Sequence, residues 1–128
     1  MSADLRLEVV QVPVADIDRA KAFYVDQAGF NADHDTQISE TVRVVQLTPR
    51  GSACSIVLGT GLNSMAPGTI EGLQLVTSDM AAARGEMVER GVDVSEVEDL
   101  GRPGGPTFKH AHFKDPDGNT WVLQELPS

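Results

Sequence analysis

The chain has 128 residues, of which 41% are apolar and 23% are charged, and its formal net charge is −9. This length suits one domain and is too short for two ordinary ones, and the apolar content excludes intrinsic disorder. The apolar runs stay well below the roughly 18 residues that a membrane-spanning helix needs. We therefore expect a single domain over residues 1–128, with a hydrophobic core.

The acidic balance limits the partners that we expect. The sequence holds 19 Asp and Glu residues against 10 Lys and Arg residues, with no basic stripe. Because a nucleic-acid binder needs clustered cations to displace counterions, DNA, RNA and anionic membranes are not expected partners. The start lacks the basic and apolar regions of a signal peptide, and Cys54 is the one cysteine. These features predict a cytoplasmic protein whose partner is a small molecule or a second chain.

The first half predicts one helix among strands. Residues 5–14 are rich in β-branched side chains, which predicts a strand. Asp16 then occupies a helix N-cap position, and apolar residues at helical spacing lead to Gly29, where we expect the helix to end. Further strands are predicted at 30–36, 41–49 and 53–59.

The second half repeats this order. A strand is predicted at 72–77, and Asp79 occupies the N-cap of a second helix that ends at Gly91. The buried face of that helix is predicted to consist of Met80, Ala83, Met87 and Val88. Another strand is predicted at 92–97.

A hairpin is predicted at the end of the chain. Its strands cover 107–114 and 120–126 and flank the turn Asp115-Pro116-Asp117-Gly118-Asn119. Pro116 sets a turn conformation and Gly118 accepts the left-handed position that follows. We expect both aspartates to serve the turn and to be solvated.

The two halves are related by an internal duplication. The segment Val14–Ala20 aligns with Thr77–Ala83, and each half reads strand, helix and three strands. We place the modules at residues 4–60 and 69–127, joined by a Gly-, Pro- and Ser-containing stretch at 60–68. A half of this size is marginally stable alone, so the modules must pack together or pair with a second chain.

Two segments resemble a known family. They run from Val12 to Tyr24, followed by Gly29-Phe30, and from Phe113 to Glu125. In these segments the chain resembles the vicinal oxygen chelate superfamily, which includes glyoxalase I, bleomycin-resistance proteins and extradiol dioxygenases. The resemblance implies an α+β fold in which two βαβββ modules form a curved mixed sheet with a cup, usually completed by a homodimer.

The resemblance also assigns four cup-facing positions to the ligands of one divalent metal ion. In this chain they fall on Val9, Val57, Gly72 and Val122. None of these residues has a side-chain donor atom, so we expect no metal cofactor. A register shifted by one residue would supply Glu8 and Glu71 but would also direct Ile56 and Trp121 at the metal. One divalent metal at a displaced site stays as the alternative.

Two histidines are the candidate catalytic residues. His110 and His112 lie two positions apart on a predicted strand, so their side chains share one face. Ala111 and Phe113 then face the helices. An imidazole can accept or donate a proton near neutral pH, which suits general acid–base catalysis. The pair could instead contribute to a displaced metal site, although no third ligand is assigned.

Strand alternation predicts a polar ligand-binding face. The residues expected to line the cup with the two histidines are Gln11, Ser55, Gln74, Thr120 and Gln124. Leu73, Leu75, Trp121 and Leu123 are expected to face the helices. Such an amide-rich cup suits an uncharged or weakly anionic organic ligand.

Two arginines are further candidates for ligand binding. Arg43 could clamp an anionic group, although the facing of its strand is ambiguous from the sequence. Arg102 lies in the Gly- and Pro-rich loop at 100–106, which could close over the cup.

The sequence leaves three functional hypotheses. The first is a metal-free protein that binds and sequesters a small organic molecule in a dimeric cup, as bleomycin-resistance proteins do. The second is a lyase, isomerase or dioxygenase of the same superfamily, acting either without metal through His110 and His112 or with a displaced metal. The third is a pure interaction module that uses an open sheet face.

Overall fold

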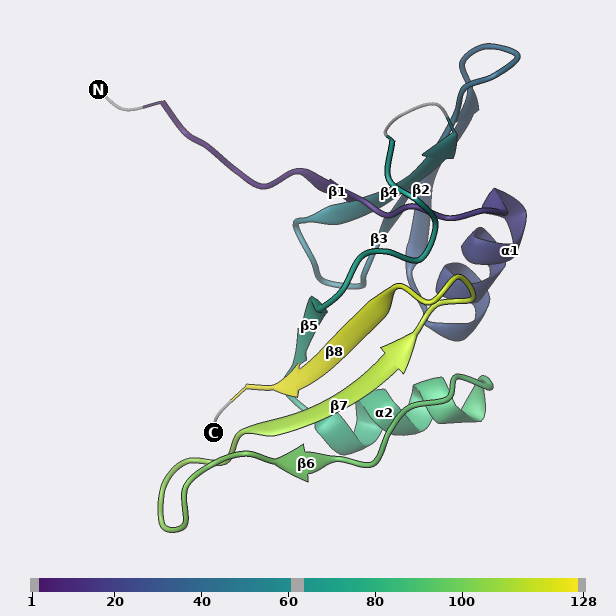
Figure 1. The fold of residues 1–128 in the computed structure, drawn as a ribbon. Coiled ribbons are helices and arrows are strands. Elements are labelled where there is room, and N and C mark those ends of the chain that lie inside the picture. The colour runs from purple at the N-terminus through teal and green to yellow at the C-terminus, as the bar shows by residue number, and fades with distance from the viewer. Residues whose placement is uncertain (1–2, 61–63, 127–128) are drawn as a thin grey trace.

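The computed structural model describes residues 3–60 and 64–126, which form two four-stranded mixed sheets (Figure 1). The first sheet has the order β1-β4-β3-β2, with bounds Val9–Gln11, Ser55–Thr60, Arg43–Thr48 and Asn31–Gln37. The second has the order β5-β8-β7-β6, with bounds Leu73–Thr77, Thr120–Glu125, Lys109–Lys114 and Glu98–Asp99. In each sheet the first strand pairs in parallel and the other pairs are antiparallel. The expected α+β fold of two βαβββ modules is confirmed.

The joint between the modules is only partly described. Residues 61–63 of the predicted connecting stretch at 60–68 lie outside the described residues. The strands fall within the predicted modules at 4–60 and 69–127. The module boundaries and the single-domain assignment stay predictions.

Helix α1 (Ile17–Ala22) begins where the sequence predicts. The Asp16 carboxylate accepts a hydrogen bond from the Arg19 backbone N–H at 3.1 Å. After α1 the chain continues into a π-helical turn, η1 (Phe23–Gln27), in which the Ala28 N–H donates to the Phe23 carbonyl at 2.9 Å. The wider turn buries both consecutive residues Phe23 and Tyr24. Gly29 ends the helical segment with a φ of 82°, which a side chain would strain.

Helix α2 (Met80–Glu89) confirms the second N-cap, because Asp79 accepts from the Ala82 backbone N–H at 3.0 Å. Met80 and Met87 are buried as expected, but Val88 is 45% exposed. The expectation for Val88 is wrong because each helical residue adds about 100° of rotation. Residue 87 returns almost to the direction of residue 80, and residue 88 is turned away from it by about 80°.

Two predicted strands differ from the structure: the strand at 5–14 is shorter, and the strand at 92–97 is absent from those residues. Only Val9–Gln11 of the predicted strand at 5–14 pairs, with β4 as its partner. The preceding segment extends away from the sheets (Figure 1), and Leu5 is 96% exposed. No residue of the predicted strand at 92–97 lies in a strand of the structure. The short β6 follows that segment and pairs with β7, while Val92 and Val94 are buried. Burial of these valines, rather than strand pairing, explains the apolar pattern there.

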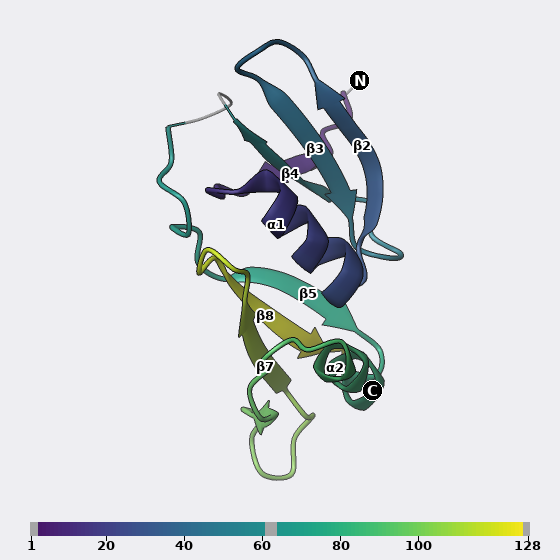
Figure 2. The ribbon, with the colours of Figure 1, turned by 90° about the vertical axis from the view of Figure 1, so that its right-hand side faces the viewer.

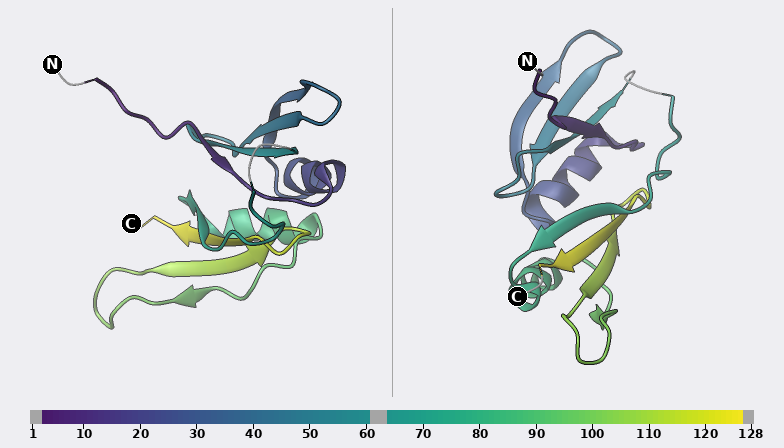
Figure 3. Two further views of the ribbon diagram at one scale, coloured as in Figure 1. Left: turned by 45° about the horizontal axis from the view of Figure 1, so that its top comes forward. Right: turned by 90° about the vertical axis from the view of Figure 1, so that its left-hand side faces the viewer.

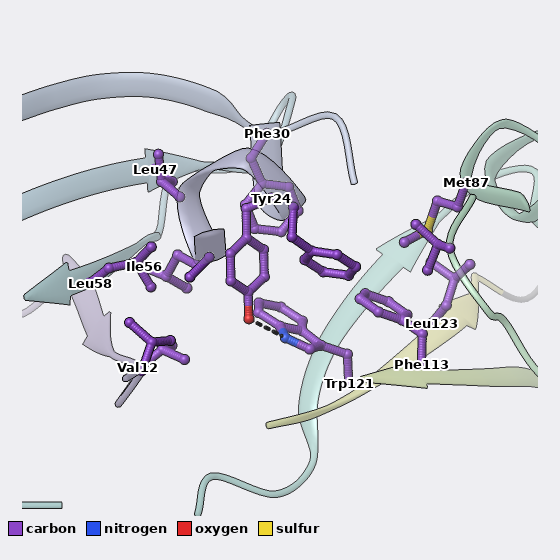
Figure 4. Packing of buried hydrophobic residues seen from close by; sticks show 14 of the residues in the cluster. Val12, Tyr24, Phe30, Leu47, Ile56, Leu58, Met87, Phe113, Trp121 and Leu123 are labelled. Carbon is purple, nitrogen blue, oxygen red and sulfur yellow. Dashed lines mark hydrogen bonds between the residues drawn. The ribbon is translucent and has the colours of Figure 1, made fainter. Parts of the chain in front are cut away.

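Both sheets bury one face in a common core. Helix α1 lies between the first sheet and the second sheet (Figure 2), and the two modules form two layers (Figure 3). Trp121 of β8 lies at the centre of this core (Figure 4), with its ring centroid 5.8 Å from Tyr24 and 5.7 Å from Phe30. Aromatic contacts of this kind, together with the buried area, join the modules.

A buried hydrogen-bond network accompanies the aromatic contacts. The Trp121 indole N–H donates to the Tyr24 hydroxyl oxygen at 2.9 Å, and the Tyr24 hydroxyl donates to the Asp115 carboxylate at 2.7 Å (Figure 4 draws the first bond). The other carboxylate oxygen of Asp115 accepts three backbone N–H groups of its own turn. Burial, and then the nearby Asp115 charge, raise the pKa of the Tyr24 hydroxyl far above its usual value, so it remains a donor.

The turn itself was predicted correctly in one respect and wrongly in another. Gly118 has a φ of 100°, as the turn requires. Asp115 is 5% exposed rather than solvated, because it accepts the hydroxyl of Tyr24 from the other module. The side-chain amide of Asn119 adds a second link, since it donates to the carbonyl of Pro13 at 2.9 Å.

We predict that Tyr24→Phe lowers the free energy of unfolding by about 2 kcal/mol, because the substitution leaves a buried indole N–H without its acceptor and a buried carboxylate with one donor fewer. Urea denaturation at fixed protein concentration measures the change. Val88→Ala on the exposed side of α2 is the control and should change stability by less than about 0.5 kcal/mol. A Tyr24→Phe effect no larger than that of the control would contradict a linking role for the network.

Candidate functional site

The side of each sheet that faces away from the helices carries most of the predicted ligand-binding residues. In the second sheet, Trp121 and Leu123 are buried in the core, whereas Thr120 and Gln124 alternate with them and face the other way. In β7, Ala111 and Phe113 are likewise buried, and His110 and His112 alternate with them. We call the sides turned away from the helices the open faces of the two sheets.

The open face of the second sheet is hollowed. It contains a concavity of about 660 Å³ whose lining includes Glu71, Ser95, His112, Lys114, Thr120 and Val122. Gln74 lies beside it on β5 and donates a hydrogen bond to the Gln124 side chain. The structure therefore brings Gln74, His110, His112, Thr120 and Gln124 together on one sheet face.

The two histidines have different surroundings. The His110 ring lies 4.9 Å from the Phe108 ring between centroids, and its Nδ1 atom is 3.2 Å from the Phe108 carbonyl oxygen. Across the sheet, His110 is flanked by Glu98 of β6 and Gln124 of β8. The side chain of His112 is exposed at the concavity. Either imidazole is placed to exchange a proton or a hydrogen bond with a molecule on this face.

Gln11 and Ser55 lie on the open face of the first sheet. Ser55 is 5% exposed and its hydroxyl contacts the side chains of Gln46 and Thr48. Gln46 and Thr48 were not among the predicted site residues. Alternation could have found them, because Leu47 between them is fully buried and the two neighbours must face the opposite side.

The two arginines do not join these residues. Arg43 lies on the helix-facing side of β3, where its guanidinium contacts Asp18 at 2.9 Å and Asp35 at 2.8 Å. Arg102 is exposed in the loop between β6 and β7 and is not among the residues that line the concavity. The facing of the Arg43 side chain was ambiguous from the sequence because Arg43 is the first residue of its strand. At the end of a sheet, residues on both faces can be exposed, so the apolar pattern does not distinguish the two faces.

The positions that the resemblance assigns to metal ligands can now be located. Val9 and Val57 lie on the open face of the first sheet, and Val122 lies on that of the second. Gly72 immediately precedes β5. The alternative register is wrong, because its members Ile56 and Trp121 are buried in the core. Within residues 3–60 and 64–126, no group of three or more His, Cys, Asp or Glu side chains is arranged to hold a metal ion.

The arrangement of the modules directs the open faces outward. The opposite faces of both sheets, together with α1 and α2, bury their apolar residues in one shared cluster. The open faces of one chain therefore point away from each other and cannot form two walls of the same cup. None of the helices in the described parts of the chain is long and apolar enough to cross a membrane.

Comparisons with known proteins identify relatives of this architecture. The family model described as the Glyoxalase/Bleomycin resistance protein/Dioxygenase superfamily matches residues 6–123. The crystal structure of TnmS3, an antibiotic binding protein from Streptomyces sp. CB03234, is 35% identical, with a TM-score of 0.84 and 100% coverage of both chains. A search of curated protein sequences gives no significant match.

Two further solved structures agree with this assignment. A glyoxalase/bleomycin resistance protein from Streptomyces sp. CB03234 is 35% identical, with a TM-score of 0.77, over 93% of this chain and 99% of the other. A superfamily member from Sphaerobacter thermophilus DSM 20745 is 30% identical, also with a TM-score of 0.77, over 96% of this chain and 98% of the other. The likeness therefore extends over nearly the whole chain.

We predict that Asp35→Asn destabilises the protein at pH 7 by no more than about 1 kcal/mol, because the ion pairs are partly exposed. Hydrogen bonds from Arg43 and then Lys21 hold the pKa of the Asp35 carboxyl well below its usual range. A lowered folded-state pKa stabilises the protein above the usual carboxyl pKa of about 4, and this contribution is lost as the pH falls through the folded-state value.

Thermal unfolding of both proteins between pH 7 and pH 3 measures this difference. It should be largest near neutral pH and should shrink as the pH falls below about 4. Asp18→Asn, at a more exposed partner of the same Arg43, is the control and should have a smaller effect. A difference that stays constant over the whole range would show that the charge of Asp35 is not the cause.

Proposed function

The chain belongs to the Glyoxalase/Bleomycin resistance protein/Dioxygenase superfamily, and we propose that it binds and sequesters a small organic molecule in a cup closed by a second copy of the chain. The observation that carries this proposal is the hollow on the open face of the second sheet, which polar side chains such as His112 and Thr120 line together with Val122. A relative of 35% identity over the full length is an antibiotic binding protein, which supports the same class of function.

The homodimer follows from the direction of the open faces. A small molecule on one face alone would stay half exposed, whereas ligand sites in proteins bury most of the ligand surface. Since one chain turns its open faces apart, we infer that the first sheet of one copy meets the second sheet of another and that the ligand is enclosed between them. Exposed apolar side chains support such a contact, since Val76 on the open side of β5 is 60% exposed and Leu7 is 70% exposed.

We propose that the cup binds its ligand without the divalent metal ion that the resemblance would assign to it. Valines at three of the four assigned positions offer hydrocarbon, and Gly72 offers no side chain. Binding would then rest on apolar contact with these valines and on hydrogen bonds from the amides and imidazoles beside them. We keep the cytoplasm as the expected location, on the strength of the sequence prediction.

Native mass spectrometry tests this function directly. We expect a species of twice the 13.7 kDa chain mass. A panel of apolar organic molecules, antibiotics included, should raise the unfolding temperature of this dimer, because a ligand stabilises the state that binds it. Failure of every compound to bind would remove the support for sequestration.

We predict that Val76→Asp converts the dimer to monomers, because it places a charge on the apolar part of the proposed contact. Val88→Asp is the matched control, since Val88 is also exposed, at 45%, but lies on α2. Sedimentation velocity should give a monomer for the first variant and a dimer for the second. Dimers of equal stability in both variants, or a monomeric parent protein, would contradict closure through the open faces.

We also predict that the purified protein retains less than about a tenth of an equivalent of metal after supplementation with zinc, nickel, manganese or iron and dialysis, because the assigned positions lack donors. Elemental analysis measures the metal content. His110→Ala with His112→Ala is the comparison variant and should give the same result as the parent protein. One equivalent of metal in the parent, lost in the double variant, would favour a displaced metal site instead.

A further inference from the structure

Four polar side chains form a hydrogen-bonded chain across the open face of the first sheet. Gln46 on β3 donates through Nε2 to the Ser55 hydroxyl on β4 at 3.2 Å. The hydroxyl oxygens of Ser55 and Thr48 are 2.6 Å apart, and the Thr48 hydroxyl donates to the Asp33 carboxylate on β2. The chain thus connects three strands and ends on a negative charge.

The donor and the acceptor can be assigned for each bond of this hydrogen-bonded chain of side chains. A carboxylate accepts only, so the single hydroxyl hydrogen of Thr48 is used on Asp33. Ser55 must then donate to Thr48, and Gln46 must donate to Ser55. Both hydroxyl hydrogens therefore point toward Asp33, and neither is available to a ligand.

This hydrogen-bonded chain of side chains offers a ligand mainly hydrogen-bond acceptors. The second carboxylate oxygen of Asp33 and the side-chain oxygen of Gln46 have no hydrogen bond to another described residue. Against these, the chain retains one donor, the second N–H of Gln46. Because Ser55 is 5% exposed and already paired, the acceptors are held in place before a ligand arrives.

The charge on the open face of the first sheet also favours a ligand that donates hydrogen bonds. A bulge at Ala32/His34 leaves Asp33 outside the regular pairing, and its carboxylate reaches Thr48 on the open side. Arg43 of β3 and Lys21 of α1 lie on the helix side of this sheet, where both contact Asp35. Among the described strand residues of this open face, Asp33 carries the one fixed charge.

We propose that the ligand presents a hydrogen-bond donor, as a protonated amine or a hydroxyl group, to Asp33 and Gln46, and that this sheet selects cationic and neutral molecules over carboxylates and phosphates. The inference rests on the proposed binding function and specifies its ligand class. It replaces the expectation of an uncharged or weakly anionic ligand. The imidazoles of the second sheet do not oppose this, because a histidine can donate or accept.

Four fluorescent probes with the same aromatic ring test the proposal in the intact protein. They are 9-(aminomethyl)anthracene, 9-anthracenemethanol, 9-methylanthracene and 9-anthracenecarboxylate, which differ in charge and in the donor that they carry. Fluorescence titration should show that the amine binds about tenfold more tightly than the carboxylate, with the alcohol between them.

Asp33→Asn and Asp35→Asn form a matched pair, because they make the same substitution two residues apart on opposite sides of β2. Asp33→Asn should reduce the preference for the amine over the carboxylate to less than about threefold and should leave the affinity for 9-methylanthracene unchanged. Asp35→Asn should retain the full preference. Both residues are exposed at the sheet edge, so neither variant should fail to fold.

The outcomes separate this inference from the function on which it rests. If the carboxylate binds as tightly as the amine, or if Asp33→Asn retains the preference, the donor selection is overturned while small-molecule binding stands. If none of the four probes binds, the inference falls together with the proposed function.

Discussion

The contact between Trp121, Tyr24 and Asp115 determines how the two modules are joined, and through that the direction of every surface available for function. Trp121 comes from β8, Tyr24 from η1 and Asp115 from the turn between β7 and β8. Each is buried and each is satisfied by the others. Separating the modules would expose the aromatic area and would also break hydrogen bonds to a buried carboxylate, so the two costs arise together.

This junction has a functional consequence, because it occupies the helix-facing side of both sheets. The open faces are left to point outward, with the hollow of the second sheet on one side and the Gln46–Asp33 chain of the first sheet on the other. Neither face has an opposing wall in its own chain. A binding site that draws on both therefore couples ligand recognition to association of two chains, and each cup of a symmetric dimer would combine imidazoles from one copy with the Asp33 carboxylate of the other.

The sequence predicted what depends on local chemistry and missed what depends on distant contacts. The sequence predicted that Asp16 and Asp79 cap their helices. That prediction needs no tertiary information, because an N-cap depends only on a carboxylate that immediately precedes residues with helical spacing. The opposite facing of Thr120 and Trp121 follows from strand alternation alone. The burial of Asp115 was missed because its partner Tyr24 is 91 residues away in sequence. Asp33 was missed because a β-bulge interrupts the alternation that would have placed it.

The division between core and open faces also explains how the fold can be retained with valines at the positions assigned to metal ligands. Helix caps, the turn at Gly118 and the aromatic cluster all act on the helix side or at the ends of strands. Val9 and Val122 lie on the other side, where a change of side chain leaves those interactions intact. The stability of the scaffold is thus largely independent of the chemistry that it presents. The function of this chain must therefore be determined from the residues of the open faces, and membership of the superfamily alone does not supply it.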